Sequence, residues 1–346
     1  MSINRIRAFS QAFGPPGFED DILALAQQHA PPGYHTQRDS LLNIYLQQPP
    51  VQGLPTLMLD AHSDEVGLMV RAIKNDGTIL CTALGGWAAS ALVAQRMLVQ
   101  TRGGQRITGV IAAKPPHLGK EEPATIDQLV LDVGASSNDE VLALGITPGC
   151  PVVPKSDFEQ RGDLLFGKAF DDRLGCAAVL DVLHEMQGKA LGVNLVGTLS
   201  SQEEMGLRGA KVSVNRVQPD VAICLEGAPA DDAQGDSQLS QTALGRGPML
   251  RLIDNSMISN PRFIAFVLDI AAQHHIPVQQ AIRTGGSTNG GVLHLAQLGV
   301  PTIVLACPVR YAHSHNGIAH LQDYRHMVQL TAALVQTLTQ ELIAAF

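Results

Sequence analysis

The chain has 346 residues, of which 45% are hydrophobic and 16% charged, and its formal net charge is -8. A chain of this length is expected to form about two domains and can bury a large core. The acidic balance, without any block of Lys or Arg, argues against nucleic acid or an anionic membrane as the main partner, because both require clustered positive charge.

The sequence predicts neither a leader nor a membrane span. The first residues, MSINRIRAFSQAF, lack the apolar core of a signal peptide, and no uncharged apolar stretch reaches the roughly 18 residues of a membrane-spanning helix. The five cysteines form no CxxC pair, and most lie in apolar runs such as VAICL, where cysteine acts as a small buried hydrophobic residue. We therefore expect a protein of the reducing cytoplasm.

The N-terminal part predicts two helices and two strands. Amphipathic patterns favour helices over residues 3–13 and 18–29, with the sequence GPPG between them. A strand is expected over residues 40–47. The nearly continuous apolar run over residues 55–61 is typical of a strand that is buried on both faces.

The pattern changes between residues 66 and 159. Short β-like runs such as GLMVRAI, TILCTA and RITGVIAA alternate with Gly and Pro, and the sequence RGGQ predicts a hairpin turn. Long helical periods are mostly missing here. We therefore expect residues 66–159 to form a small β-rich domain, inserted into a larger domain that comprises residues 1–65 and 160–346.

Helices and apolar strands alternate again in the second half of the chain. Asn260 and Pro261 have the residue types of a helix cap and a first helical position. Such alternation predicts an α/β fold built on a layered sheet. The expected elements are helices over residues 172–186, 260–274 and 323–345, and buried strands over residues 194–199, 221–225 and 302–306.

Polar side chains follow several of these strands. PTLMLDA is followed by HSD, NLVGTLSSQ by EE, VAICL by a single E, and TIVLA by a segment that contains AHS, while FDDR stands just before a predicted helix. Ligand sites of open α/β sheets form at the carboxyl ends of the strands, so these side chains should meet at one edge. The residues concerned are His62, Asp64, Asp171, Glu203, Glu204, Glu226 and His313.

Two histidines and several carboxylates suit zinc or a similar divalent ion. Carboxylates crowded together would repel one another without cations between them. One bridging carboxylate with two further ligands for each metal gives a two-metal site, in which the metals lie about 3.5–4 Å apart. The alternative for each single residue is an ordinary polar side chain at a loop end, but the combination of five groups favours a metal site.

Four segments, in this order and spacing, resemble the M42 family of metallo-aminopeptidases, which includes glutamyl and leucyl aminopeptidases and the tetrahedral TET peptidases. They are AHSDEVGLMV, KAFDDRLGC, SSQEEMGLRGA and VRYAHS. The shorter sequences GGW, KPPH, LDVGASS and LGITPG are similar to that family's inserted domain. The resemblance covers nearly the whole chain, and it implies a mixed-sheet two-metal peptidase domain with an inserted β-rich domain.

The resemblance also implies a role for each residue of the site. Asp171 would bridge both metals, His62 and Glu226 would complete one metal, and Glu204 and His313 would complete the other. Glu203 would be the general base that activates a water at the two metals. Asp64 would stand behind His62 and fix its tautomer.

The chain departs from the family pattern at two positions. Glu226 stands where the TET enzymes usually have Asp, which keeps the charge and adds one methylene group. Asp231 and Asp232 are the alternative ligands near Glu226. The loop Gly285-Gly286-Ser287-Thr288-Asn289 has Thr288 where the family commonly has an acid, so its role near the substrate stays open. His315 is the alternative to His313.

The predicted function is therefore the hydrolysis of N-terminal residues from peptides by a cytoplasmic metallo-aminopeptidase. Two divalent metal ions are expected in each subunit, with zinc preferred and cobalt or manganese as alternatives. By resemblance the chain forms a homo-oligomer, such as a tetrahedral dodecamer. The alternatives are a metal-dependent hydrolase of another class, since some family members carry the name endoglucanase, and a non-catalytic metal-binding assembly protein. A glycoside hydrolase has no need of two histidines.

Overall fold

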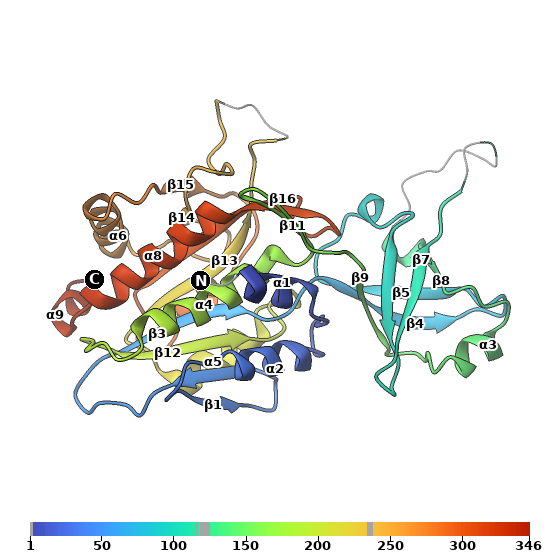
Figure 1. Cartoon of the computed structure of the whole chain (residues 1–346), viewed down its shortest axis with the longest axis horizontal. Helices are drawn as coiled ribbons and strands as arrows, with labels where there is room; N and C mark the ends of the chain where they lie inside the picture. Colours follow the sequence, from blue (N-terminus) through green and yellow to red (C-terminus); the bar gives the residue numbers. More distant parts are fainter. Residues whose placement is uncertain (1–2, 115–116, 118–124, 234–237) are drawn as a thin grey trace.

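The computed structural model describes residues 3–114, 117, 125–233 and 238–346. It contains a large mixed sheet covered by helices and, beside it, a small antiparallel barrel (Figure 1). The predicted α/β class with an inserted β-rich domain is therefore confirmed. The exact domain boundaries stay a prediction, and part of the KPPH segment lies outside the described residues.

The large sheet has eleven strands in the described part of the chain, in the order β1-β2-β12-β3-β13-β16-β17-β11-β10, with β14 paired to β16 and β15 to β14. The neighbours β12, β3, β13 and β16 run parallel, while β2 joins β12 in the antiparallel direction. The strands are β1 His35–Arg38, β2 Ile44–Gln47, β3 Thr56–His62, β10 Glu159–Arg161, β11 Leu164–Gly167, β12 Asn194–Ser200, β13 Val221–Pro229, β14 Met249–Ile253, β15 Gln279–Ile282, β16 Thr302–Arg310 and β17 Gly317–His320.

Helices cover both faces of this sheet. On one face α4 packs against β3 and β13 and is itself flanked by α1 and α8, and on the other face α5 and α7 pack together. The helices of this domain are α1 Ile3–Gln11, α2 Asp20–Gln28, α4 Phe170–Met186, α5 Arg208–Val217, α6 Pro261–Gln273, α7 Gly290–Leu293, α8 Leu321–Thr337 and α9 Gln340–Ala345. None of the helices in the described ranges is long and apolar enough to cross a membrane.

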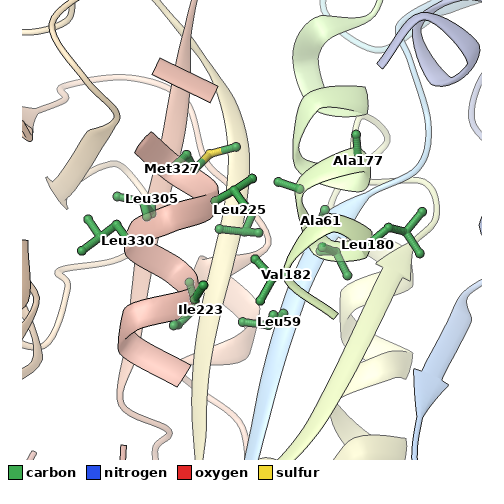
Figure 2. Close-up of a cluster of buried hydrophobic side chains, with 14 of the residues drawn as sticks. Leu59, Ala61, Ala177, Leu180, Val182, Ile223, Leu225, Leu305, Met327 and Leu330 are labelled. Atoms are coloured by element: carbon green, nitrogen blue, oxygen red, sulfur yellow. The ribbon is translucent and has the colours of Figure 1, made fainter. Parts of the chain in front are cut away.

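Burial on both faces explains why the central strands are continuous apolar runs. Leu59 and Ile223 point toward α4 and α8, where they meet Leu180 and Leu330 (Figure 2). Their chain neighbours point the other way and join a second cluster under α5 and α7. Because the side chains of a strand alternate between faces, both sets of positions must be apolar.

The barrel closes in the order β4-β5-β8-β7-β6-β9. Gln100 pairs with Arg106 across the hairpin that the sequence predicts, and Gly104 has a φ of 80° within that turn. The barrel also carries the short helix α3 Asn138–Ala143 and the 3-10 turns Ala89–Ala91 and Ile126–Gln128. Its strands are β4 Gly67–Ile73, β5 Ile79–Leu84, β6 Arg96–Gln100, β7 Arg106–Ile111, β8 Val130–Asp132 and β9 Pro151–Pro154.

Two predicted elements differ from the structure. The strand expected over residues 40–47 starts only at Ile44, because Asp39 accepts hydrogen bonds from the backbone of Leu41 and Asn43 and holds a turn there. The single helix expected over residues 323–345 is broken at the buried Leu338, whose ψ of 131° ends α8, and Thr339 caps α9.

Candidate active site and metal centre

The predicted site residues meet around a cavity of about 620 Å³ at the carboxyl ends of the parallel strands. His62 is the last residue of β3, and Glu226 lies within the neighbouring β13. Glu203 and Glu204 follow β12, and His313 follows β16. Parallel strands end at the same edge of a sheet, which is why segments far apart in sequence supply one site.

His62 forms the buried half of the site together with Asp171 and Glu226. Its Nε2 lies 2.9 Å from Oδ1 of Asp171 and 3.3 Å from Oε1 of Glu226. Its Nδ1 lies 3.1 Å from the backbone oxygen of Asp64, so an Nδ1–H can donate to that oxygen and leave the Nε2 lone pair free for a ligand. Although burial opposes the charged imidazole, Glu226 and Asp171 raise the pKa of His62 well above its usual value.

His313 forms the second half together with Glu204 and the other oxygen of Asp171. Its Nε2 lies 3.2 Å from Oδ2 of Asp171 and 3.1 Å from Oε1 of Glu204. Its Nδ1 lies 2.8 Å from the carbonyl oxygen of Gly86, which follows β5 of the barrel. Burial lowers the pKa of His313, but its hydrogen bonds with Asp171 and Glu204 outweigh this and raise it to about 11.

The donor atoms fit divalent metal ions. An ion such as zinc binds nitrogen and oxygen at about 2.0–2.2 Å, so two of its ligand atoms lie roughly 3–3.5 Å apart. The four contacts of Asp171, Glu204 and Glu226 with the two imidazoles fall between 2.9 and 3.3 Å. Asp171 turns one oxygen toward each imidazole, which is the arrangement of a bridging carboxylate.

Asp172 also lies within ligand distance of His62 and Glu226. However, its Oδ2 accepts a hydrogen bond from the backbone N–H of His62, and its Oδ1 accepts one from Gly175. Both oxygens are therefore engaged, and the side chain is fully buried. Asp172 supports the backbone that carries His62, and Asp171 is the acid that faces the two imidazoles.

The carboxylate of Glu203 lines the cavity and, among the described residues, accepts no hydrogen bond and forms no ion pair. Burial raises its pKa well above the usual value, and the charges of Glu226, Glu204 and Asp64 add to this increase, while His62 opposes it. A carboxylate with a raised pKa is a stronger base than an ordinary one, which suits a group that takes a proton from water.

Asp64 does more than the sequence predicts. Its carboxylate lies 3.4 Å from Nδ1 of His62. Its two oxygens also accept hydrogen bonds from the backbone N–H groups of Glu203, at 2.9 Å, and of Glu204, at 3.0 Å. The side chain is completely buried. One carboxylate therefore orients both His62 and the segment that carries the two glutamates.

Sequence reasoning missed two glycines that allow the site to form. A Cβ at Gly227 would lie 2.7 Å from the Cα of Asp171, so only glycine allows the start of α4 to approach β13. Gly85 has a φ of 90°, and a Cβ there would lie 3.0 Å from Oε2 of Glu204. Both contacts join segments that are distant in the sequence, so no local pattern reveals them. Gly85 belongs to the GGW sequence that resembles the family, but the resemblance does not indicate its contact with Glu204.

The alternative ligands lie elsewhere. Asp231 and Asp232 pair with Arg283 and Arg310. His315 turns its Nε2 toward the backbone oxygen of Arg96, at 3.0 Å. The structure therefore places none of the three alternatives with the imidazoles and carboxylates described above.

Another part of the cavity wall contains the loop of residues 285–288 together with Arg251 and Arg283. Thr288 is buried in this wall, and the next residue, Asn289, donates a hydrogen bond to Asp60 of β3. The loop thus approaches the site closely. The two arginines were not singled out from the sequence, because neither belongs to a recognisable motif.

A family model and a curated relative both match most of this chain. A family described as M42 glutamyl aminopeptidase matches residues 43–330. A glutamyl aminopeptidase of Lactococcus lactis is 33% identical over 350 aligned residues, which cover 99% of this chain and 98% of that protein.

Solved structures share the fold over the whole chain. A TET aminopeptidase of a marine sediment Thaumarchaeota archaeon superposes with a TM-score of 0.94 at 33% identity and covers 99% of this chain and 98% of its own. The TET1 peptidase of Pyrococcus horikoshii, which can assemble into a tetrahedron or a large octahedral shell, superposes with a TM-score of 0.88 at 28% identity, covering 97% and 99%.

Proposed function

The chain belongs to the M42 glutamyl aminopeptidase family and is an enzyme that hydrolyses N-terminal residues from peptides, and from this premise we propose that it works with two divalent metal ions and with Glu203 as its general base. The observation that supports this most directly is the pair of imidazole–carboxylate groups that share Asp171, with the carboxylate of Glu203 lining the same cavity.

The proposed ligands divide into two sets. His62 and Glu226 would hold one ion, Glu204 and His313 would hold the other, and Asp171 would be shared by the two sets. Zinc suits this mixture of nitrogen and oxygen donors, and cobalt or manganese would be accepted as well. When bound, the ions lower the pKa of a water molecule and polarise the carbonyl group of the substrate.

Glu203 moves the proton in this proposal. Its carboxylate accepts a proton from the attacking water and then donates it to the nitrogen of the leaving amine. The raised pKa favours the first of these steps, because a carboxylate with a higher pKa is a stronger base toward the water. Asp64 keeps the backbone of Glu203 in place while the proton moves.

Replacing Glu203 with Gln tests the role of the base. The amide has nearly the same shape but cannot take a proton, so the bound metal should remain while kcat falls by about 10²–10⁴-fold. Metal content by mass spectrometry and hydrolysis of an aminoacyl chromogenic substrate are the two measurements. The matched variant Glu204→Gln should instead lose metal. Hydrolysis by E203Q at the wild-type rate would disprove the proposed mechanism.

The part of the cavity wall that contains Arg251 and Arg283 bears on the choice of substrate. Arg251 is paired with Asp254 and Arg283 with Asp231, each at 3.0 Å, so the wall carries little net charge but offers guanidinium N–H groups. These groups suit an acidic or uncharged N-terminal side chain better than a basic one. A panel of aminoacyl substrates should show the lowest kcat/KM for Lys and Arg, and a preference for either residue would contradict this assignment.

Membership of the family decides against the two alternative functions, the non-peptidase hydrolase and the non-catalytic metal-binding protein.

Oligomerisation is proposed by analogy, since the Pyrococcus TET1 peptidase can assemble into a tetrahedron or a large octahedral shell. We expect the barrel to provide contacts between copies. Light scattering on the purified protein measures the assembly directly, and a monomer at micromolar concentration would refute the proposal.

A further inference from the structure

The segment that follows β12 is held by two buried carboxylates from different parts of the chain. The backbone N–H of Gln202 donates to Oε1 of Glu19 at 3.1 Å, and the next two N–H groups, those of Glu203 and Glu204, donate to Asp64. Three successive donors are thus bound. The carboxylate of Glu203 depends on this segment for its direction, because among the described residues it accepts no hydrogen bond and forms no ion pair of its own.

Glu19 is fixed firmly enough to serve as an anchor. Its carbonyl oxygen accepts hydrogen bonds from Ile22 and Leu23 in the first turn of α2. Its Oε1 also accepts the N–H of Gly17, at 2.9 Å, and its side chain is completely buried. The other oxygen, Oε2, is buried without a hydrogen-bond partner in the part of the chain that the structure describes.

The backbone conformation of Gln202, which Glu19 supports, is energetically unfavourable. Gln202 has a φ of 51°, in the left-handed region that is unfavourable for a residue with a side chain. A residue in such a conformation persists when its surroundings determine it. The hydrogen bond from Gln202 to Glu19 is one of these surroundings. Arg208, whose N–H donates to the carbonyl oxygen of Gln202 at 3.2 Å, provides another.

An uncharged acceptor is sufficient at this position. Burial, reinforced by the nearby charge of Asp64, raises the pKa of Glu19 to about 8. A glutamine side chain therefore resembles the form of Glu19 present at neutral pH, and its amide oxygen can accept the same two N–H groups. This makes Glu19→Gln a conservative variant.

We propose that Glu19 is a positioning residue of the active site, which holds the Gln202 peptide and thereby directs the carboxylate of Glu203 toward the reacting water. This inference rests on the proposed role of Glu203. A purely structural role for Glu19, as an anchor of α2 alone, would stabilise the fold without affecting the chemical step.

The experiment compares three variants. Glu19→Met removes the acceptor but keeps a side chain of similar length, and Glu19→Gln keeps the acceptor. Ile22→Ala, in the first turn of α2 and fully buried, removes packing while it leaves the hydrogen bond from Gln202 to Glu19 intact. The measurements are kcat, KM, metal content and melting temperature, together with hydrogen exchange of the peptide that spans residues 200–206 in the metal-free protein.

We expect E19M to lower kcat by about 10–100-fold, the range that a displacement of about 1 Å produces, with KM and metal content little changed. E19Q should stay within about threefold of the wild type. Exchange over residues 200–206 should rise in E19M but not in E19Q or I22A. Should E19M not fold, Glu19→Ala takes its place with the same measurements.

Two outcomes would overturn the inference. In the first, E19M loses no more kcat than I22A does for the same fall in melting temperature. In the second, exchange over residues 200–206 is unchanged in E19M. Failure of the proposed function is distinguished from both, because it shows as retained activity in E203Q, a variant in which Glu19 is intact.

Discussion

His62 and His313 hold the two halves of the proposed metal centre in different ways. The side chain of His62 is 2% exposed and belongs to a central strand, whereas that of His313 is 36% exposed and belongs to a loop. Strand hydrogen bonds and Asp172 fix the backbone of His62. His313 has a φ of 57° and relies on the carbonyl oxygen of Gly86, next to the barrel.

This difference indicates that the larger domain alone determines one half, while the other half needs the larger domain and the barrel together. A buried site with pre-oriented ligands loses its metal slowly, because its ligands cannot move apart without disturbing the core. The exposed half can open locally. We therefore expect the two ions to differ in affinity and in exchange rate. The following variants test this difference.

The largest effect is expected from Asp171→Asn, which breaks both halves at once. The amide cannot bridge two cations as a carboxylate does, so metal content should fall for both ions. Activity should fall by roughly 10³-fold or more, because each metal contributes several kcal/mol of transition-state stabilisation. The control Asp232→Asn weakens an ion pair with Arg310 and a hydrogen bond from the backbone of Leu244, both outside the proposed ligand set, and it should keep both its metal and its activity.

The next effect separates the halves. During chelation, the wild type should release its ions in two phases that differ by roughly tenfold in rate, or about 1.4 kcal/mol. His313→Ala should show only the slow phase, and His62→Ala only the fast one. Released metal is followed with a colorimetric indicator. A single phase in the wild type would show that the two halves are equivalent.

A smaller effect is expected from Gly85→Ala, which should disturb only the His313 half. The added Cβ meets Val66 at 2.7 Å and Glu204 at 3.0 Å. Affinity for the weaker ion should fall by about 10–100-fold, as measured by calorimetry. Gly104→Ala introduces the same left-handed strain at a barrel hairpin with no neighbour within 4 Å, so it should reduce stability and leave metal affinity unchanged. Equal metal affinities in the two variants would contradict this explanation.

The smallest effect is expected from Glu226→Asp in the His62 half. The charge is kept and the side chain is one methylene shorter, so affinity for the tighter ion should change by less than about tenfold. Glu226→Gln, which removes the charge, is the matched comparison and should weaken that ion much more. If E226D and E226Q bind metal equally, Glu226 is not a ligand.

Much of the fold could be predicted because its signals are local. The central strands are continuous apolar runs since both faces are covered, and Asn260 begins α6 with its side chain as a cap. The break at Leu338 could not be predicted in this way. The carbonyl oxygen of Leu338 lies 2.6 Å from the position that a Cβ at Gly192 would take, and nothing in the local sequence reveals that close approach.

The candidate site shows the same division. The residue types alone indicate which side chains can bind metal, and their positions directly after apolar strands predict that they meet at one edge of the sheet. Which donor faces which is known only from the folded structure. The supports of the site come from segments too distant to form any sequence pattern: Glu19 under Gln202, Gly86 beside His313, and Gly227 against Asp171. Chemistry resides in residue types that a sequence displays, whereas orientation results from contacts that exist only after folding.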